Sequence, residues 1–239
     1  MTRAKHLTTV ALLVVSTLPL QAGLIVNGGF EAGLSGWTRA DQFGSEGAFL
    51  LQTGTVTPVT GIPVASPPEG SNAAMTDAEG PGSHVLYQDF VVPTAVANAL
   101  LTFSLYINNG APAFETPNTL DFATPTLNQQ VRVDIVRATA EPFSVNPADI
   151  LMSVYRTQVG DALQSGYTPI SVDVTSLLQA NANQTLRLRF AEVDNVFTFN
   201  AGVDAVDITT NAVPEPSTWL LVSSVLLGAA LHRRDNARM

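Results

Sequence analysis

The chain contains no cysteine, and it has only one lysine and three histidines. Without cysteine no disulfide can stabilise the protein, and thiolate metal sites and a cysteine nucleophile are excluded. Of the histidines, only His84 lies between residues 23 and 212, so a metal site built from several histidines is excluded as well.

Positive charge is also scarce. Residues 23–212 hold six arginines, no lysine and eighteen acidic residues, which gives a net charge of −12. Affinity for a nucleic acid comes mainly from lysine and arginine that neutralise its phosphates, so this surface would repel one. We therefore expect no nucleic-acid partner. An acidic exterior suits an exported protein or one that binds cations.

No pattern of catalytic residues stands out in the sequence. His84 follows Ser83 directly, but the strand–turn–helix elbow that presents a nucleophilic serine is missing around this pair. The acidic residues could supply a glycosidase pair, although the sequence gives no reason to choose any two of them. The sequence thus predicts no catalytic residue and a non-enzymatic protein, with a hydrolase as the alternative.

The N-terminus has the layout of a secretory signal peptide. Arg3 and Lys5 precede an apolar stretch over residues 7–18, and residues 19–22 offer a cleavage region. We predict cleavage after Ala22, so that residues 1–22 are removed. The alternative is an uncleaved anchor, which the short apolar stretch disfavours because a membrane span needs about 20 residues.

The C-terminus carries a second apolar segment. Residues 219–231 contain no charge, and as a helix they would reach roughly 20 Å, against about 30 Å for the hydrocarbon core of a bilayer. Pro214 and Pro216 prevent this helix from extending upstream. Arg233 and Arg234 favour the cytoplasmic side, which leaves the preceding domain outside. We predict a short transmembrane helix over 219–231 that holds the chain transiently in the inner membrane.

The order of these features resembles the PEP-CTERM sorting domain of exosortase-dependent bacterial proteins. The residues that carry the resemblance are Val213, Pro214, Glu215, Pro216, Arg233 and Arg234. The resemblance implies that residues 213–239 are a sorting signal, recognised by the exosortase, a membrane-embedded cysteine peptidase. It also implies a Gram-negative bacterium that makes extracellular polysaccharide, and delivery to the cell surface or the extracellular matrix. The alternative is an ordinary C-terminal anchor.

Between the two ends, the chain has the pattern of a β protein. Alternation of apolar and polar residues predicts strands, and clusters of Gly, Pro, Asn and Asp predict the loops between them. The alternating segments are 84–92, 100–108, 130–138, 151–157, 169–175, 185–193 and 202–209. Only residues 175–180 suggest a short helix. We predict an all-β fold in which residues 23–212 form a single jelly-roll β-sandwich of roughly eight to ten strands.

Three segments resemble the galactose-binding-like jelly rolls, which include carbohydrate-binding modules of families 4 and 9. They are LIVNGGFEAGLSGWT at 24–38, residues 170–195, and VDAVDIT at 203–209. In that family a calcium ion often ties the first strand to the last, and Glu31 and Asp204 stand at the matching positions. The resemblance therefore implies a structural calcium site at Glu31 and Asp204, with the oxygen ligands that calcium prefers. The alternative is that both are solvated surface acids.

Exposed aromatic rings would be the sign of a sugar-binding surface. Tyr106, Phe114, Phe122 and Tyr155 are the candidates, although packing in the core is favoured for each, and Trp37 is expected to be structural. The ligand-binding residues stay undefined. We expect an exported surface or matrix protein, structural or adhesive, that binds extracellular polysaccharide weakly. A surface glycan hydrolase and a passive surface protein without a ligand are the alternatives.

Overall fold

The computed structural model describes residues 21–211. All but the last two residues of the predicted signal peptide, and the whole predicted sorting segment, lie outside this range. The first strands are β1 (Gln21–Gly23), β2 (Thr38–Asp41), β3 (Ala48–Thr53), β4 (Asn72–Asp77), β5 (Gly82–Val91) and β6 (Asn98–Asn109). The later elements are β7 (Gln129–Arg137), β8 (Ile150–Arg156), β9 (Gln164–Asp173), α1 (Thr175–Ala180), β10 (Thr185–Asp194) and β11 (Phe199–Asn211).

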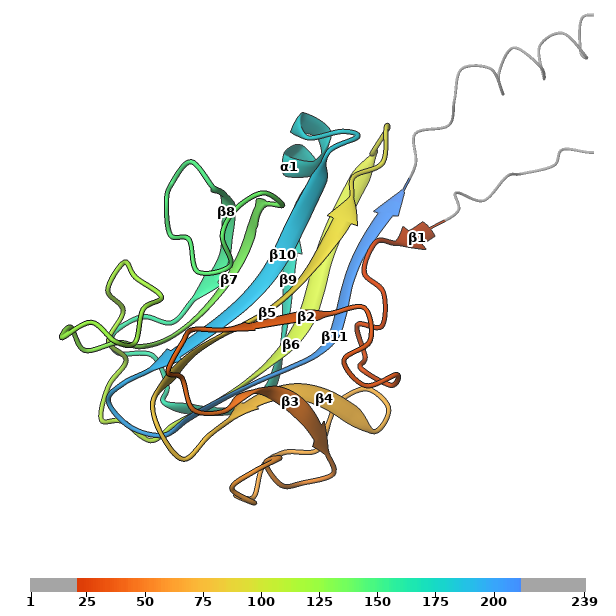
Figure 1. Ribbon diagram of the computed structural model, residues 1–239. Coiled ribbons are helices and arrows are strands. Elements are labelled where there is room, and N and C mark those ends of the chain that lie inside the picture. Colours follow the sequence, from red (N-terminus) through yellow and green to blue (C-terminus); the bar gives the residue numbers. More distant parts are fainter. Residues whose placement is uncertain (1–20, 212–239) are drawn as a thin grey trace, which may run out of the picture.

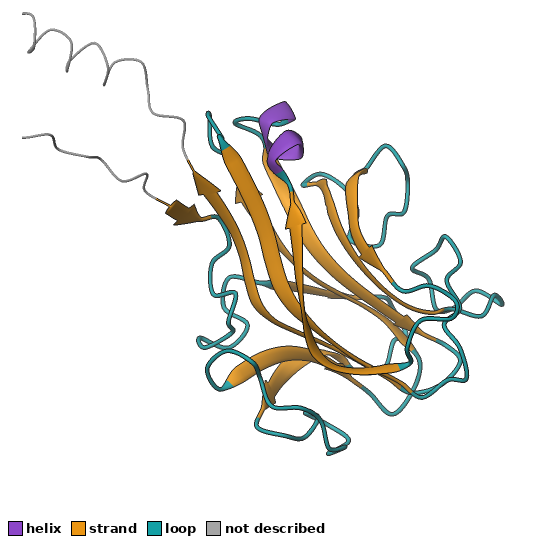
Figure 2. Cartoon of the chain, turned by 180° about the vertical axis from the view of Figure 1, so that it is seen from behind, coloured by secondary structure: helices purple, strands orange, loops and turns teal. Residues whose placement is uncertain are grey.

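The strands form two antiparallel sheets that pack against each other (Figure 1). Sheet A has the order β3-β4-β11-β6-β9, and β1 pairs with the end of β11. Sheet B has the order β2-β5-β10-β7-β8. Figure 2 shows strands in both layers and the short helix α1 at one end of the sandwich. The predicted all-β sandwich is confirmed.

The core lies between the sheets because the strands alternate. In β10, Leu186, Leu188 and Phe190 point inward and are almost fully buried, whereas Arg187 and Arg189 between them point to the outer face. The ring of Phe190 lies 5.9 Å from that of Trp37. Trp37 is buried, so the expectation that it is structural is confirmed.

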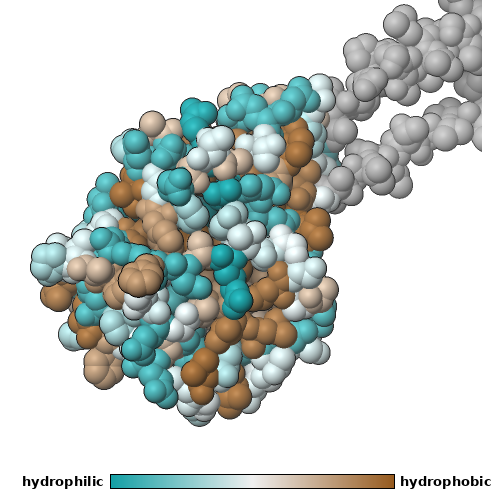
Figure 3. All heavy atoms as spheres, in the orientation of Figure 1, coloured by the Kyte–Doolittle hydropathy of each residue, from teal (hydrophilic) through white to brown (hydrophobic). Residues whose placement is uncertain are grey.

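Apolar side chains on the face drawn in Figure 3 form small patches between hydrophilic ones. The most exposed large apolar residues are spread over the chain: Phe43, Val159 and Phe197 lie in different loops, and Val91 ends β5. Apolar residues scattered in this way are usual on protein surfaces and do not mark a docking face.

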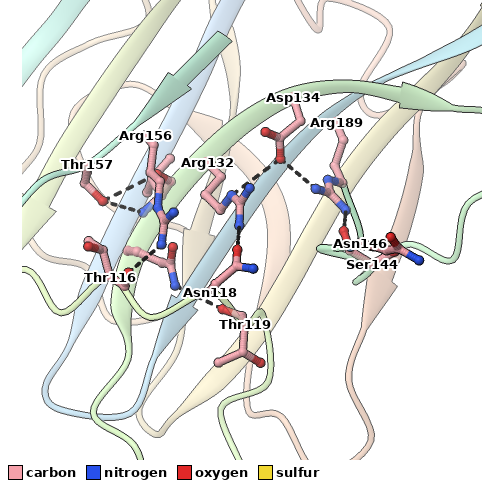
Figure 4. A network of polar contacts seen from close by, with 12 residues as sticks. Thr116, Asn118, Thr119, Arg132, Asp134, Ser144, Asn146, Arg156, Thr157 and Arg189 are labelled. Carbon is pink, nitrogen blue, oxygen red and sulfur yellow. Dashed lines mark hydrogen bonds and ion pairs between the residues drawn. The ribbon is translucent and has the colours of Figure 1, made fainter. Parts of the chain in front are cut away.

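Arginines fasten two loops to the outer face of sheet B (Figure 4). Arg189 donates to the carboxylate of Asp134 at 2.6 Å and, through Nη1, to the carbonyl oxygen of Ser144 at 2.7 Å. Arg156 donates to the carbonyl oxygen of Pro117 at 2.9 Å in the second loop. These guanidinium groups therefore bind parts of the chain itself.

Both described ends of the chain lie side by side. Gln21 stands opposite Asn211 where β1 pairs with β11, and the two ends leave the sandwich at the same place in Figure 1. The predicted cleavage point after Ala22 falls within β1. The pairing continues past this point, because the N–H of Leu24 donates to the carbonyl oxygen of Ile208 at 3.0 Å.

The alternation of apolar and polar residues in the sequence predicted the later strands correctly but not the earlier ones. Every alternating segment overlaps one of the strands β5 to β11, and α1 covers the predicted residues 175–180. Strands β2, β3 and β4 were not predicted. In β4 the five residues from Ala73 to Asp77 are all buried, so the strand shows no alternation between a buried and a solvated face.

Candidate functional site

The loop after β1 and the closing strand β11 meet backbone to backbone. The N–H of Val206 donates to the carbonyl oxygen of Gly28 at 3.0 Å, and a Cβ added at Gly28 would overlap the carbonyl oxygen of Val206. Asn27 has a φ of 54°, and its Nδ2 donates to the carbonyl oxygens of Gly33 and Ser35 at 2.9 Å each. The Asn-Gly pair therefore shapes a turn that only a residue without a side chain can complete.

Glu31 and Asp204, the predicted calcium ligands, both bind the backbone just before β4. Glu31 Oε1 accepts hydrogen bonds from the N–H groups of Ser71 and Asn72, at 2.8 and 2.9 Å. Asp204 Oδ2 accepts one from the N–H of Glu69 at 2.9 Å. The structure thus brings the two predicted ligands to one short segment. It also adds Glu69, a third acid that no sequence pattern had singled out.

Asp204 is fully buried, whereas Glu31 and Glu69 are exposed. Burial raises the pKa of Asp204 to about 6, and the charges of Glu69 and Glu31 add to the rise. A cation would relieve this repulsion, and a donor set made only of oxygen suits calcium. The two predicted ligands are, however, already bound to backbone N–H groups. The calcium site stays a prediction.

An open groove of about 650 Å³ lies over the outer face of sheet A. Its walls come from β6, β9 and the loop between β3 and β4, and its lining residues are Ile62, Pro63, Val64, Ala65, Tyr106, Asn108, Gln164, Ser165 and Gly166. The ring of Tyr106 lies 5.4 Å from that of Tyr167. The absence of a side chain at Gly202 allows Tyr167 to adopt this position, because a Cβ added there would lie 2.7 Å from the Tyr167 hydroxyl. The groove therefore joins an aromatic ring with amide side chains, and none of its lining residues is charged.

The other aromatic candidates pack inside the protein. Phe114 is fully buried, 5.9 Å from the ring of Phe199. Tyr155 packs against the main core, and Phe122 packs against a smaller cluster of apolar residues. Core packing is confirmed for Phe114. Tyr106 is only 7% exposed but lines the groove.

Ser83 and His84 do not form a catalytic pair. Consecutive strand residues point to opposite faces of a sheet. Ser83 Oγ accepts a hydrogen bond from the N–H of Phe122 at 3.0 Å, whereas His84 lies opposite Glu192 of β10.

Nor do Glu192 and Asp194 form a glycosidase pair. Asp194 lines a pocket of about 240 Å³, but Glu192 does not line it and is 1% exposed. A hydrolase of this kind needs both carboxyl groups beside the scissile bond, so this pair does not serve that chemistry.

The predicted sorting residues Val213, Pro214, Glu215, Pro216, Arg233 and Arg234 lie outside the described residues, as does the predicted helix 219–231. Within residues 21–211, no helix is long and apolar enough to cross a membrane.

Comparison with known families identifies the C-terminal segment. The model of the PEP-CTERM protein-sorting motif matches residues 212–234. The chain therefore carries this motif, and the resemblance seen in the sequence is confirmed. No curated protein matches the chain.

Several solved structures are similar to this chain. TmCBM61 in complex with β-1,4-galactotriose is similar at 10% identity, with 78% of this chain and 97% of that chain covered and a TM-score of 0.47. The structure of CBM4 is similar at 11% identity, with 78% and 99% covered and a TM-score of 0.44. The Stig cyclase Fisc from Fischerella sp. TAU is similar at 16% identity, with 81% and 100% covered and a TM-score of 0.47. These neighbours include carbohydrate-binding modules as well as an enzyme.

Proposed function

We propose that the chain is an exported protein of a Gram-negative bacterium, and that an exosortase-type membrane peptidase reads its C-terminal segment. Residues 23–212 then reach the cell surface or the extracellular matrix. The sorting motif at 212–234 is the observation that carries this proposal. The pairing of β1 with β11 supports it, because it places the point at which the sorting segment follows Asn211 at one end of the sandwich. Binding of that segment by the peptidase would leave the opposite end of the sandwich facing away from the membrane.

Mass spectrometry of the mature protein tests this routing. The native chain should begin at Gly23 and lack Arg233 and Arg234, whereas a variant with alanines at 214–216 should keep both arginines. Alanines at 124–126, which replace three residues of a distant loop including one proline, are the control and should leave processing unchanged. If the native protein and the 214–216 variant both retain the two arginines, the segment is a permanent anchor.

In this proposal the sandwich is a non-enzymatic module that binds extracellular polysaccharide weakly and acts in adhesion or matrix structure. The groove over β6 and β9 supports a polymer ligand because it is open and uncharged. Tyr106 can contact the apolar face of a sugar, and the amides of Asn108 and Gln164 can bind hydroxyl groups. The strongly acidic domain favours a neutral polymer over an acidic one.

Capture of the full chain on immobilised neutral and acidic polysaccharides tests the binding. The double substitution Asn108→Ala with Gln164→Ala should weaken capture by about tenfold, because it removes two hydrogen-bonding side chains. Ser153→Ala, an exposed change on β8 in the other sheet, should not change it. Equal capture of all variants would show that the polysaccharide binds outside this groove. Failure to bind any polymer would support the alternative of a passive surface protein without a ligand. Release of reducing sugar from a polymer would support the alternative of a hydrolase.

We also propose that calcium joins the loop after β1 to β11, with Glu31 and Asp204 among its ligands. Calcium added after EDTA treatment should then raise the melting temperature of the full chain. Glu31→Gln should abolish the rise, while Glu141→Gln, at an exposed acid of a distant loop, should preserve it. An unchanged melting temperature for the native chain means that the site is absent.

A further inference from the structure

A row of polar side chains crosses sheet B at the end of the sandwich remote from β1. Asp41 of β2 stands opposite His84 of β5, and His84 stands opposite Glu192 of β10. Asp194 follows Glu192 on the same face of β10, because side chains two residues apart share a face. Phe190 shares this parity and belongs to the core, so the row points between the two sheets.

Two atoms of this row lack the contacts that buried polar atoms normally have. His84 Nε2 and Glu192 Oε1 are buried, and neither has a hydrogen-bond partner within the described part of the chain. Both residues are only 1% exposed. A buried polar atom without a partner costs free energy, so each such atom in a folded protein calls for an explanation.

The side chains that carry these two atoms also converge with a third. Among residues 21–211, His84, Glu192 and Asp194 are the one group of three ionisable side chains whose possible ligand atoms all lie within 4.8 Å of one another. Asp41 Oδ1 lies 2.7 Å from His84 Nδ1. A carboxylate on one imidazole nitrogen places the proton there and directs the lone pair of the other nitrogen to the cluster, as partners of metal-bound histidines do.

Gly82 leaves room beside the imidazole. A Cβ added at Gly82 would overlap Nε2 and lie 2.8 Å from Cε1 of His84, so this space is free only because residue 82 is glycine. The N–H of Gly82 donates to Asp194 Oδ1 at 2.8 Å and fixes that carboxylate. Asp194 also lines the pocket of about 240 Å³, together with Glu79, which gives a cation an acidic path from solvent.

We propose that His84 Nε2 and the carboxylates of Glu192 and Asp194 bind a divalent first-row transition metal ion, with Zn²⁺ as the representative. One imidazole nitrogen with two carboxylates is a usual ligand set for such ions, and calcium prefers oxygen ligands alone. The site is therefore separate in both place and chemistry from the calcium site proposed at Glu31 and Asp204. It does not depend on the polysaccharide-binding role.

The charge state of the cluster supports this assignment. Burial raises the pKa of Glu192 well above its usual range, and the neighbouring Asp194 adds to the rise. Burial also raises the pKa of Asp194 to about 6. Two carboxylates held together away from water repel each other, and a bound dication would stabilise both in the ionised form.

Zn²⁺ titration of the EDTA-treated full chain tests the proposal. Elemental analysis should find Zn²⁺ in the native chain, and calorimetry should give its affinity. Glu192→Gln, which keeps the shape of the side chain, should weaken that affinity by at least about tenfold, and so should His84→Gln. Gly82→Ala should do the same by filling the space in front of Nε2. The control Glu141→Gln should bind as the native chain does.

A second measurement separates metal binding from a purely structural role. Zn²⁺ should raise the melting temperature of the native chain and not that of Glu192→Gln, while the metal-free Glu192→Gln variant should melt no lower than the metal-free native chain because it no longer buries a carboxyl group. If His84→Gln does not fold, Glu192→Gln and Gly82→Ala still decide the matter. Equal Zn²⁺ affinity in the native chain and Glu192→Gln, or no binding by the native chain, overturns the proposal.

Discussion

Arg189 is the side chain whose loss should most weaken the sandwich. It and Asp134 are both fully buried, and Nη2 donates to Asp134 Oδ2 at 2.6 Å. Its Nη1 donates to the carbonyl oxygens of Pro142 and Ser144 at 2.9 and 2.7 Å. Arg189→Met retains an unbranched apolar chain but removes all three donated hydrogen bonds, which leaves a buried carboxylate without its main partner.

The expected cost follows from these contacts. Removing one partner of a buried ion pair costs about 3–5 kcal/mol. Arg132 offsets part of this, because its Nε lies 3.6 Å from the same oxygen of Asp134. The two carbonyls can reach water when their loop loosens, so their lost bonds add about 1 kcal/mol. We expect Arg189→Met to lower the free energy of unfolding by about 4 kcal/mol, which lowers Tm by roughly 8–16 °C in a domain of this size.

Urea unfolding of the full chain, followed by circular dichroism at neutral pH, measures this effect. Arg137→Met is the matched control, since Arg137 is exposed and donates from Nε to the carbonyl oxygen of Ala148 in the same loop at 2.9 Å. It should cost less than about 1 kcal/mol. Adding Asp134→Leu to Arg189→Met should recover about half of the loss, because no unpaired carboxylate remains.

Two results would refute this reasoning. If Arg189→Met unfolds at the same urea concentration as Arg137→Met, the buried pair contributes no more than an exposed hydrogen bond. Alternatively, the double variant could be no more stable than the single one, which would show that the unpaired carboxylate of Asp134 is not the source of the loss.

Three further predictions concern the loop after β1, the buried acid of β11 and the groove. Gly28→Ala should lower the free energy of unfolding by about 1–3 kcal/mol in urea, because its Cβ overlaps the carbonyl oxygen of Val206; an unchanged midpoint would contradict the close approach. The pKa of Asp204 is raised from 3.8 to about 6, so the folded state holds this proton more tightly than the unfolded chain. Stability in EDTA should therefore fall as pH rises from about 4 to about 6 and stay lower above that range. Asp204→Asn should reduce this slope in thermal melts, and the part that remains belongs to Asp194, whose pKa is also raised to about 6; a slope equal to that of the native chain would contradict the contribution of Asp204. Gly202→Ala should displace Tyr167 and weaken polysaccharide capture several-fold. Unaltered capture would show that Tyr106 and Tyr167 do not contribute to binding.

Part of the candidate chemistry followed from local sequence. The pair Glu31 and Asp204 was suggested by the resemblance of two motifs to the galactose-binding-like jelly rolls, and in the structure both accept hydrogen bonds from the segment that leads into β4. Glu69 was missed because it lies in a loop without a regular pattern, and its neighbours in space are not its neighbours in sequence. Tyr167 was missed for the same reason, since its contact with Tyr106 crosses from β9 to β6.

The role of His84 shows the limit most clearly. In the sequence, the lone histidine argued against a site with several histidines but gave no reason to consider one histidine with two acids. Its partners Glu192 and Asp194 are brought to it only by the register of β5 against β10. A hydrogen bond within this cluster joins Gly82 to Asp194, residues 112 positions apart. No periodicity in the sequence encodes a register over that distance.

The sequence by itself determined the sorting motif, the class of fold, most of the strands and the absence of thiol chemistry. These features are local: a strand is set by which of its faces meets water, and a sorting signal is a short contiguous segment. Only the tertiary structure decided which polar side chains share a buried space. Pairing of distant strands places Asp41, His84 and Glu192 in one row, and packing of the sheets removes His84 and Glu192 from water. The chemistry of these two side chains therefore depends on neighbours that the sequence does not name.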